Sequence, residues 1–114
     1  MIKLVIAGGR DFNDYELMEK KIKERYELTQ LEIVSGCANG ADKLGEKFAK
    51  ENNIPLTTFP ANWSLGKRAG MIRNEEMANY ANEAILFWDG YSSGTSNMIH
   101  TMRNKMKKFT VIRY

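Results

Sequence analysis

The sequence has little of what builds disulfides or metal centres. It holds one cysteine, Cys37, and one histidine, His100, in 114 residues. A single cysteine cannot form an intramolecular disulfide, and a single histidine leaves no Cys/His cluster to hold zinc. No stretch approaches the roughly 18 consecutive apolar residues of a membrane span, and Met1 to Ala7 lacks the pattern of a signal peptide. We therefore expect a cytoplasmic protein with no metal, no cofactor and no membrane partner.

A strong excess of either charge is also missing. The 17 lysines and arginines stand against 14 acidic residues, which gives a net charge of +3, and the pI is near 9.0. This mild bias suits ligands that carry phosphate. Residues 16–27 and 43–51 alternate basic with acidic side chains, as solvated helix faces do. The unbalanced basic residues lie near the C-terminus and are Arg103, Lys105, Lys107 and Lys108.

Apolar segments of strand length alternate with segments of helical period. The strand-like segments are Ile2 to Ala7, Leu31 to Ser35, Leu56 to Phe59, Ala84 to Trp88 and Phe109 to Ile112. Strands separated by single helices imply right-handed crossovers and a mainly parallel sheet with helices on both faces. The predicted fold class is therefore α/β, a Rossmann-like, doubly wound, five-stranded sheet, with residues 1–114 as a single domain.

The helical segments differ in the width of their apolar faces. The first is predicted to start at a capping box formed by Asn13 and Glu16. The second opens near Ala41 and stops at Asn52. The third spans roughly residues 67–82, and its wide apolar face predicts either burial on two sides or the interface of a homodimer. The fourth carries a stripe that we assign to the core, namely Met98, Ile99, Met102 and Met106.

Glycine gathers at one edge of the predicted sheet. All of the nine glycines except Gly45 follow the carboxyl end of a predicted strand: Gly8, Gly9, Gly36, Gly40, Gly66, Gly70, Gly90 and Gly94. In open α/β sheets ligands bind at this edge, and glycine allows close approach to the backbone. The asymmetry predicts a ligand site there. The alternative is that longer loops carry more glycine for their turns alone.

The first two of these loops hold candidate binding groups. In the first, Gly8 and Gly9 precede Arg10, whose guanidinium suits phosphate unless it pairs with Asp11. The second loop, residues 35–42, consists of small residues and leads into a helix N-terminus, where an anion can bind. Neither loop has a dinucleotide fingerprint or a P-loop lysine, which disfavours triphosphate hydrolysis. The candidates in the second loop are Ser35, Gly36, Gly40, Ala41 and Asp42.

Two residues of the second loop allow more than one interpretation. Asp42 is either the N-cap of the following helix or an acceptor for ligand hydroxyl groups. Cys37 lies beside a helix terminus that could lower the pKa of its thiol. No histidine lies near Cys37 in the sequence to act as a base, so a nucleophilic role is disfavoured.

The third and fourth loops add aromatic, basic and hydroxyl side chains. Trp63 either stacks on a base or covers the core. Arg68, Arg73 and Asn74 lie within about two helical turns of one another, so some of them can face the same edge. Asp89 follows a strand and could bind a ribose hydroxyl or act as a general base. The fourth loop is either a plain turn or a phosphate site, with the candidates Asp89, Gly90, Ser92, Gly94 and Thr95.

Four motifs together resemble one family. They are Gly-Gly-Arg-Asp-Phe at residues 8–12, Ser-Gly-x-Ala-x-Gly-Ala-Asp at 35–42, the Trp63 to Met77 segment, and Trp-Asp-Gly-x-Ser-x-Gly-Thr at 88–95. Their order and spacing are similar to the YspA branch of the SLOG superfamily, which is related to the Smf/DprA and LOG (lysine-decarboxylase-like) proteins. The resemblance implies a Rossmann-like fold and a nucleotide-derived ligand.

The sequence departs from LOG-type phosphoribohydrolases at the residue that matters for catalysis. Their loop reads Gly-Gly-x-Gly-Thr-x-x-Glu, whereas here Gly94 and Thr95 are followed by Met98 in place of the glutamate. Arg73 still matches the arginine of that family. Cleavage of an N-glycosidic bond needs a carboxylate, which Met98 cannot supply. Asp89 or Asp42 is a possible substitute.

Three hypotheses on function follow. The first is binding or sensing of a nucleotide or an ADP-ribose-like ligand, with phosphate on the second and fourth loops and the base near Trp63. The second is N-glycoside hydrolysis of nucleoside monophosphates, with Arg73 orienting the phosphate and Asp89 as the carboxylate. The third is DNA binding through the basic residues 103–108, and we rank it last because that run lacks interleaved aromatic residues.

Overall fold

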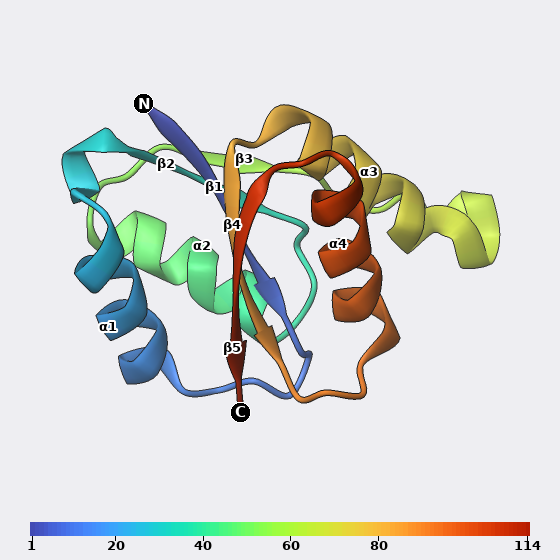
Figure 1. Ribbon diagram of the computed structural model, residues 1–114, viewed down its shortest axis with the longest axis horizontal. Helices are drawn as coiled ribbons and strands as arrows, with labels where there is room; N and C mark the ends of the chain where they lie inside the picture. Colours follow the sequence, from blue (N-terminus) through green and yellow to red (C-terminus); the bar gives the residue numbers. More distant parts are fainter.

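Five parallel strands form the centre of the molecule (Figure 1). The computed structural model describes residues 1–114, and its sheet has the order β3-β2-β1-β4-β5. The strands are β1 (Ile2–Gly8), β2 (Leu31–Ser35), β3 (Leu56–Thr58), β4 (Glu83–Trp88) and β5 (Lys108–Arg113). These bounds agree with the predicted ones within one residue. The predicted α/β, Rossmann-like fold class is confirmed.

Helices cover both faces of the sheet. Figure 1 shows α1 and α2 on one side of the strands and α3 and α4 on the other. A short 3₁₀ segment, η2, precedes α3 and projects from the body of the molecule, and a second one, η1, precedes β2. The bounds are α1 (Tyr15–Arg25), η1 (Leu28–Gln30), α2 (Ala41–Glu51), η2 (Trp63–Arg68), α3 (Ala69–Tyr80) and α4 (Ser93–Asn104). None of these helices is both long and apolar enough to cross a membrane.

Each face of the sheet has its own apolar core. On one face, Phe48 and the α1 residues Met18 and Ile22 pack against β1 and β2 side chains, all fully buried. On the other face, Met77 and Met98 pack against the opposite sides of β1 and β4. Both faces of a parallel sheet are therefore covered, which explains the continuous apolar runs in β1 and β4. Since all five strands belong to one sheet, we propose that residues 1–114 form a single domain.

The strand order places a topological switch point between β1 and β4. From β1 the chain crosses to β2 and then β3 on one side, and it later returns to β4 and β5 on the other side. β1 pairs with both β2 and β4, and Gly8 at its carboxyl end lies opposite Phe87. The loops that follow β1 and β4 therefore diverge toward opposite faces and leave a crevice at the carboxyl edge, where ligands bind in such sheets.

Several local predictions were wrong for identifiable reasons. The N-cap of α1 is Asp14, whose Oδ1 accepts the Leu17 N–H at 3.1 Å, so the predicted capping box at Asn13 does not form. Met106 is 93% exposed because α4 has already ended and its φ is 58° there. Periodicity alone cannot show where a helix stops. The third α-helix spans Ala69–Tyr80 rather than roughly residues 67–82, and residues 67 and 68 belong to the 3₁₀ segment η2.

Candidate functional site

A cleft of about 670 Å³ lies at the switch point, at the carboxyl ends of β1 and β4. Its walls come from the loops after β1, β2 and β4, from η2 and α3, and from the N-terminal half of α4. Most of the residues proposed from the sequence line it. These are Gly8, Gly9, Arg10, Asp11, Asp42, Trp63, Arg73, Asn74, Asp89, Ser92, Gly94 and Thr95.

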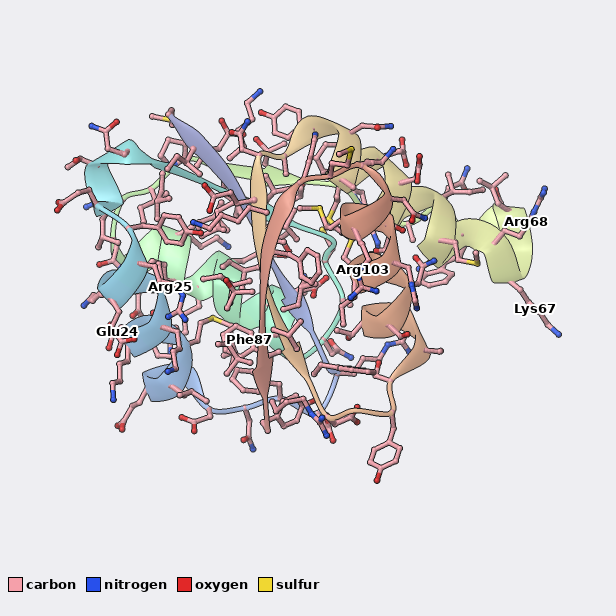
Figure 2. The ribbon with its side chains drawn as sticks, viewed as in Figure 1. Glu24, Arg25, Lys67, Arg68, Phe87 and Arg103 are labelled. Carbon is pink, nitrogen blue, oxygen red and sulfur yellow. The ribbon has the colours of Figure 1, made fainter.

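The other proposed residues lie outside this cleft. Ser35 and Ala41 are fully buried, and the Ser35 hydroxyl donates to Glu46 at 2.7 Å. Arg68 is exposed at the outer end of η2, away from the sheet (Figure 2). The three remaining residues, Gly36, Gly40 and Gly90, pack against neighbouring protein atoms. The second loop therefore contributes fewer groups to the cleft than the sequence suggested.

Glycine at this edge has two different causes. A Cβ on Gly40, whose φ is 74°, would lie 2.2 Å from the Gly9 carbonyl oxygen, and a Cβ on Gly9 would lie 1.6 Å from the Tyr114 hydroxyl oxygen. In the first two loops, glycine therefore allows the loops and the end of the chain to pack together. A Cβ on Gly94 would meet no atom within 4 Å, so the backbone there faces open space.

The first turn of α4 presents unpaired donors to the cleft. The N-cap is Ser92, whose side chain makes no capping hydrogen bond. The backbone N–H groups of Ser93, Gly94 and Thr95 donate to no acceptor in the chain, and all three residues line the cleft. Unpaired N–H groups and the positive end of the helix dipole favour an anion at this position.

Asp89 fixes the loop that leads into α4. Its Oδ1 accepts the N–H groups of Tyr91 and Ser92, each at 2.8 Å. These hydrogen bonds from Ser92 and Tyr91 lower the pKa of Asp89 below its usual value. Asp89 is therefore a carboxylate at neutral pH and a weak proton acceptor, which does not favour the general-base role considered for it.

Arg73 and Asn74 tie α3 to the loops on either side of the cleft. The Asn74 side chain donates to Asn97 Oδ1 at 2.9 Å and to the Gly94 carbonyl oxygen at 3.3 Å. Arg73 donates through Nη1 to the Gly36 carbonyl oxygen and through Nε to Asn74 Oδ1. Asn74 thus holds the first turn of α4, and Arg73 holds the second loop.

Asp42 is a buried carboxylate in the wall of the cleft. It is not the N-cap of α2, because Gly40 occupies that position. Asp42 is 3% exposed, and its Oδ2 accepts the Ala38 N–H at 3.2 Å. Burial raises the pKa of Asp42 to about 6, although the Ala38 N–H and the charge of Arg73 act in the opposite direction.

Arg10 faces the cleft without a partner in the chain. The predicted alternative, a pair between Arg10 and Asp11, does not form, because Asp11 instead accepts the Tyr114 hydroxyl at 2.6 Å. Arg10 is exposed and lines the cleft together with Trp63. Trp63 is 62% exposed, so the alternative that it covers the core is wrong. A cation and an aromatic face are therefore both accessible here.

A second, smaller cavity of about 410 Å³ adjoins the cleft and shares part of its lining, including Arg10, Trp63 and Arg73. Cys37 lines it with a φ of 68°. Burial raises the pKa of the Cys37 thiol, so the lowered pKa considered for this residue is wrong. No group of three or more His, Cys, Asp or Glu side chains is placed to hold a metal ion.

Two of the four basic residues near the C-terminus, Lys105 and Lys107, are engaged within the chain. The Lys107 ammonium lies at the C-terminus of α3 and donates to three carbonyl oxygens, those of Ala78, Asn79 and Ala81, at 2.7, 3.1 and 2.7 Å. Lys105 forms an ion pair with Glu75 at 2.6 Å. Since these two cations stabilise the fold, they offer little free charge to a phosphate backbone, and the structure does not favour the DNA-binding hypothesis.

The comparison with known families agrees with this architecture. A model of the YspA, cpYpsA-related SLOG family matches residues 2–66, more than half of the chain. The chain belongs to this family. Neither a curated protein nor a solved structure gives a match. The match to the SLOG family includes the first two loops and Trp63, whereas α3, α4 and the fourth loop lie beyond it.

Sequence reasoning missed several residues of this SLOG cleft. Lys67, Met71 and Asn97 also line it. The position of Asn97, three residues after Gly94 on a predicted helix, could have placed it on the same face. Tyr114 holds the first loop from 103 residues away in the sequence, and no local pattern indicates such a contact.

Proposed function

We propose that the cleft binds a nucleotide-derived ligand whose phosphate lies against the first turn of α4. One observation carries the proposal: the N–H groups of Ser93, Gly94 and Thr95 are unpaired and line a cleft at the switch point of a parallel sheet. A helix N-terminus at that position is a general site for phosphate groups. Membership of the SLOG family supports a nucleotide-related ligand.

The side chains around the cleft suit the remaining parts of such a ligand. Arg10 supplies a cation that no internal acidic group neutralises, and a guanidinium binds phosphate through two parallel hydrogen bonds. Trp63 and Met71 are exposed apolar side chains in the lining and can contact a base, since aromatic faces stack on any base. The sequence-based placement of phosphate on the second loop is not retained, because Asp42 lies there.

A binding titration tests this proposal. The folded protein is titrated at equilibrium with AMP, ADP, GMP, GDP and ADP-ribose, and we expect saturable binding of at least one. Arg10→Ala should weaken that binding by roughly 10-fold or more, as expected for a charged hydrogen bond. Arg68→Ala is the matched control, because it removes the same charge from an exposed residue outside the cleft. Absence of saturable binding by the folded protein would refute the proposal.

N-glycoside hydrolysis is a second candidate function. The observation that favours it is that Arg73 and Asp89 line the same cleft. Asp89 as a carboxylate could stabilise an oxocarbenium-like centre, but Met98 in the place of the family glutamate is buried and cannot assist. Release of free base from AMP or GMP, lost in Asp89→Asn, would support hydrolysis. No release from either nucleotide would contradict hydrolysis.

The predicted homodimer through the third helix remains a prediction. Met71 and Ile72 of α3 and Leu65 of η2 are exposed apolar side chains on this part of the surface. Light scattering after gel filtration, with Ile72→Glu as the variant, would measure the mass in solution. A monomeric mass for the unmodified chain at micromolar concentration would contradict the prediction.

A further inference from the structure

Asp42 is the one cleft carboxylate that is nearly completely buried. It is 3% exposed, whereas Asp11 and Asp89 are exposed or partly exposed. Asp11 accepts the Tyr114 hydroxyl, and Asp89 accepts two backbone N–H groups. These two carboxylates therefore have evident structural partners. Asp42 needs a separate explanation.

The internal hydrogen bond of Asp42 does not require a carboxylate. Its Oδ2 accepts the Ala38 N–H at 3.2 Å, and the backbone N–H of Gly36 also acts on this carboxyl group and lowers its pKa. An ionised carboxylate offers about four acceptor positions, and a neutral asparagine oxygen would accept the Ala38 N–H without the cost of burying a charge. A buried carboxylate in the wall of a cleft is a common feature of functional sites.

Arg73 is the neighbouring cation, and it forms no hydrogen bond with Asp42. A Cβ on Gly36 would lie 2.7 Å from Arg73 Nη1 and 2.9 Å from Asp42 Oδ2, so the absence of a side chain at Gly36 lets both groups lie close together. Arg73, however, donates through Nη1 to Gly36 and through Nε to Asn74. The positive charge of Arg73 therefore lowers the free-energy cost of burying the Asp42 carboxylate, but these Arg73 N–H groups do not donate to that carboxylate.

The charges divide the cleft into two parts. The first turn of α4 follows β4, and Asp42 follows β2, with β1 between the two strands. The carboxyl ends of β2 and β4 are therefore about 10 Å apart, at the usual spacing of neighbouring strands. A phosphate at α4 is favoured by the helix N-terminus, whereas a carboxylate repels phosphate. The part of the ligand at Asp42 must be uncharged and must carry hydrogen-bond donors.

We propose that Asp42 binds sugar hydroxyl groups of the ligand, so that the cleft prefers ribonucleotides to 2′-deoxyribonucleotides. This inference rests on the proposed nucleotide-binding function and adds the class of sugar. A hydroxyl group donates to the carboxylate, and a ligand without that hydroxyl leaves a buried charge unsatisfied. Sites built in this way discriminate against the analogue that lacks the donor.

Paired titrations test the inference. AMP, ADP, GMP and GDP are compared with their 2′-deoxy counterparts at pH 7.5, and we expect the ribonucleotide to bind about 10- to 100-fold more tightly. Asp42→Asn should remove most of this preference by weakening the ribonucleotide, with little change for the deoxynucleotide. Glu51→Gln is the matched control, because Glu51 is an exposed carboxylate on the same helix and does not line the cleft, and it should retain the preference.

The outcomes separate the two proposals. Saturable binding with equal affinity for both sugars overturns the inference and leaves the proposed function standing. A preference that persists in folded Asp42→Asn also overturns it, since another group then recognises the hydroxyl. If none of the nucleotides binds, the proposed function fails, and the inference fails with it. The comparison in the unmodified protein decides the matter even if Asp42→Asn does not fold.

Discussion

The Tyr114 hydroxyl donates a 2.6 Å hydrogen bond to Asp11, which joins the residue after β5 to the loop after β1. The same contact places the Tyr114 ring edge-on against Phe12, with centroids 5.0 Å apart, and Phe12 stacks on Phe87. Arg10 lies between Gly9, which contacts the Tyr114 hydroxyl, and Asp11, which accepts from it. Tyr114 therefore holds the segment that carries Arg10, a cation of the cleft with no acidic partner in the chain.

Tyr114→Phe tests this restraint. Loss of one hydrogen bond to a charged but exposed partner should lower the free energy of unfolding by about 1 kcal/mol. Burial, together with the bond to Asp11, raises the pKa of Tyr114. The contribution of the hydroxyl is therefore fully present below the unfolded pKa of about 10 and is lost as pH rises through the higher folded value. Urea unfolding at pH 7.5 and pH 11 should show a smaller difference between the two proteins at the higher pH.

If the difference in the free energy of unfolding between the two proteins does not depend on pH, the Tyr114 hydroxyl does not contribute through its hydrogen bond to Asp11. The matched control is Tyr91→Phe, because Tyr91 is exposed and its hydroxyl makes no hydrogen bond in the chain. This substitution should leave the unfolding midpoint unchanged at both pH values.

Lys107 provides a second stability prediction. Its ammonium satisfies three carbonyl oxygens at the C-terminal end of α3, where orphan carbonyls and the negative helix terminus favour a cation. Lys107→Met keeps the apolar stem but removes the donors, so it should cost about 1–2 kcal/mol in urea unfolding. Lys108→Met is the control, since the Lys108 side chain is 74% exposed and its nearest acidic oxygen is 3.9 Å away. Equal effects of the two substitutions would contradict the assigned role.

The sequence allowed the architecture to be predicted more fully than the site. Strand and helix order follow from the change between apolar runs and helical periodicity, and the glycines were concentrated at the edge of the sheet where the cleft lies. Arg68 lies outside the cleft, in the 3₁₀ segment η2, whose helical geometry is broken at Gly66, and helical periodicity does not indicate such a break. The partners of Tyr114 and Lys107 are contacts distant in sequence, and a single sequence carries no local pattern for them.

The second loop shows why the type of binding group could not be assigned from local pattern. Small residues before a helix indicate an anion site, but Ala41 donates its N–H to the Gly9 carbonyl oxygen at 3.2 Å. The Asp42 carboxylate also lines the cleft at that position. The pairing of two loops decides which N–H groups stay free, and that pairing depends on tertiary packing.

Asp42→Asn should make the protein more stable at neutral pH. Burial raises the folded pKa of Asp42 to about 6, so the protonated form is favoured in the folded state. The stability associated with this group is fully present below the unfolded pKa of about 4 and is lost as pH rises through 6. Asparagine does not ionise, so the variant should gain of order 2 kcal/mol over the unmodified protein by pH 7.5 and little at pH 3.5.

Thermal unfolding of both proteins between pH 3.5 and pH 7.5 measures this gain. A difference in Tm that stays constant across the range would contradict the raised pKa. The result also bears on the sugar inference, because a variant that is more stable yet binds ribonucleotides less tightly has lost a functional group rather than its fold. Such an exchange of stability for function is expected at binding sites.

Alanine substitutions at Gly40 and Gly94 distinguish a glycine needed for packing from a glycine that leaves room for a ligand. Gly40→Ala should destabilise the protein by about 2 kcal/mol or more, because the φ of 74° is unfavourable for alanine and the Cβ would lie 2.2 Å from the Gly9 carbonyl oxygen. Gly94→Ala should leave the free energy of unfolding unchanged or raise it by up to about 1 kcal/mol, since the added Cβ lies in open space within a helix. The same methyl group enters the proposed phosphate site and should weaken nucleotide binding at least several-fold. Urea unfolding and the nucleotide titration, applied to both variants, check these opposite expectations. A Gly94→Ala protein that binds nucleotides as tightly as the unmodified chain would move the phosphate away from α4.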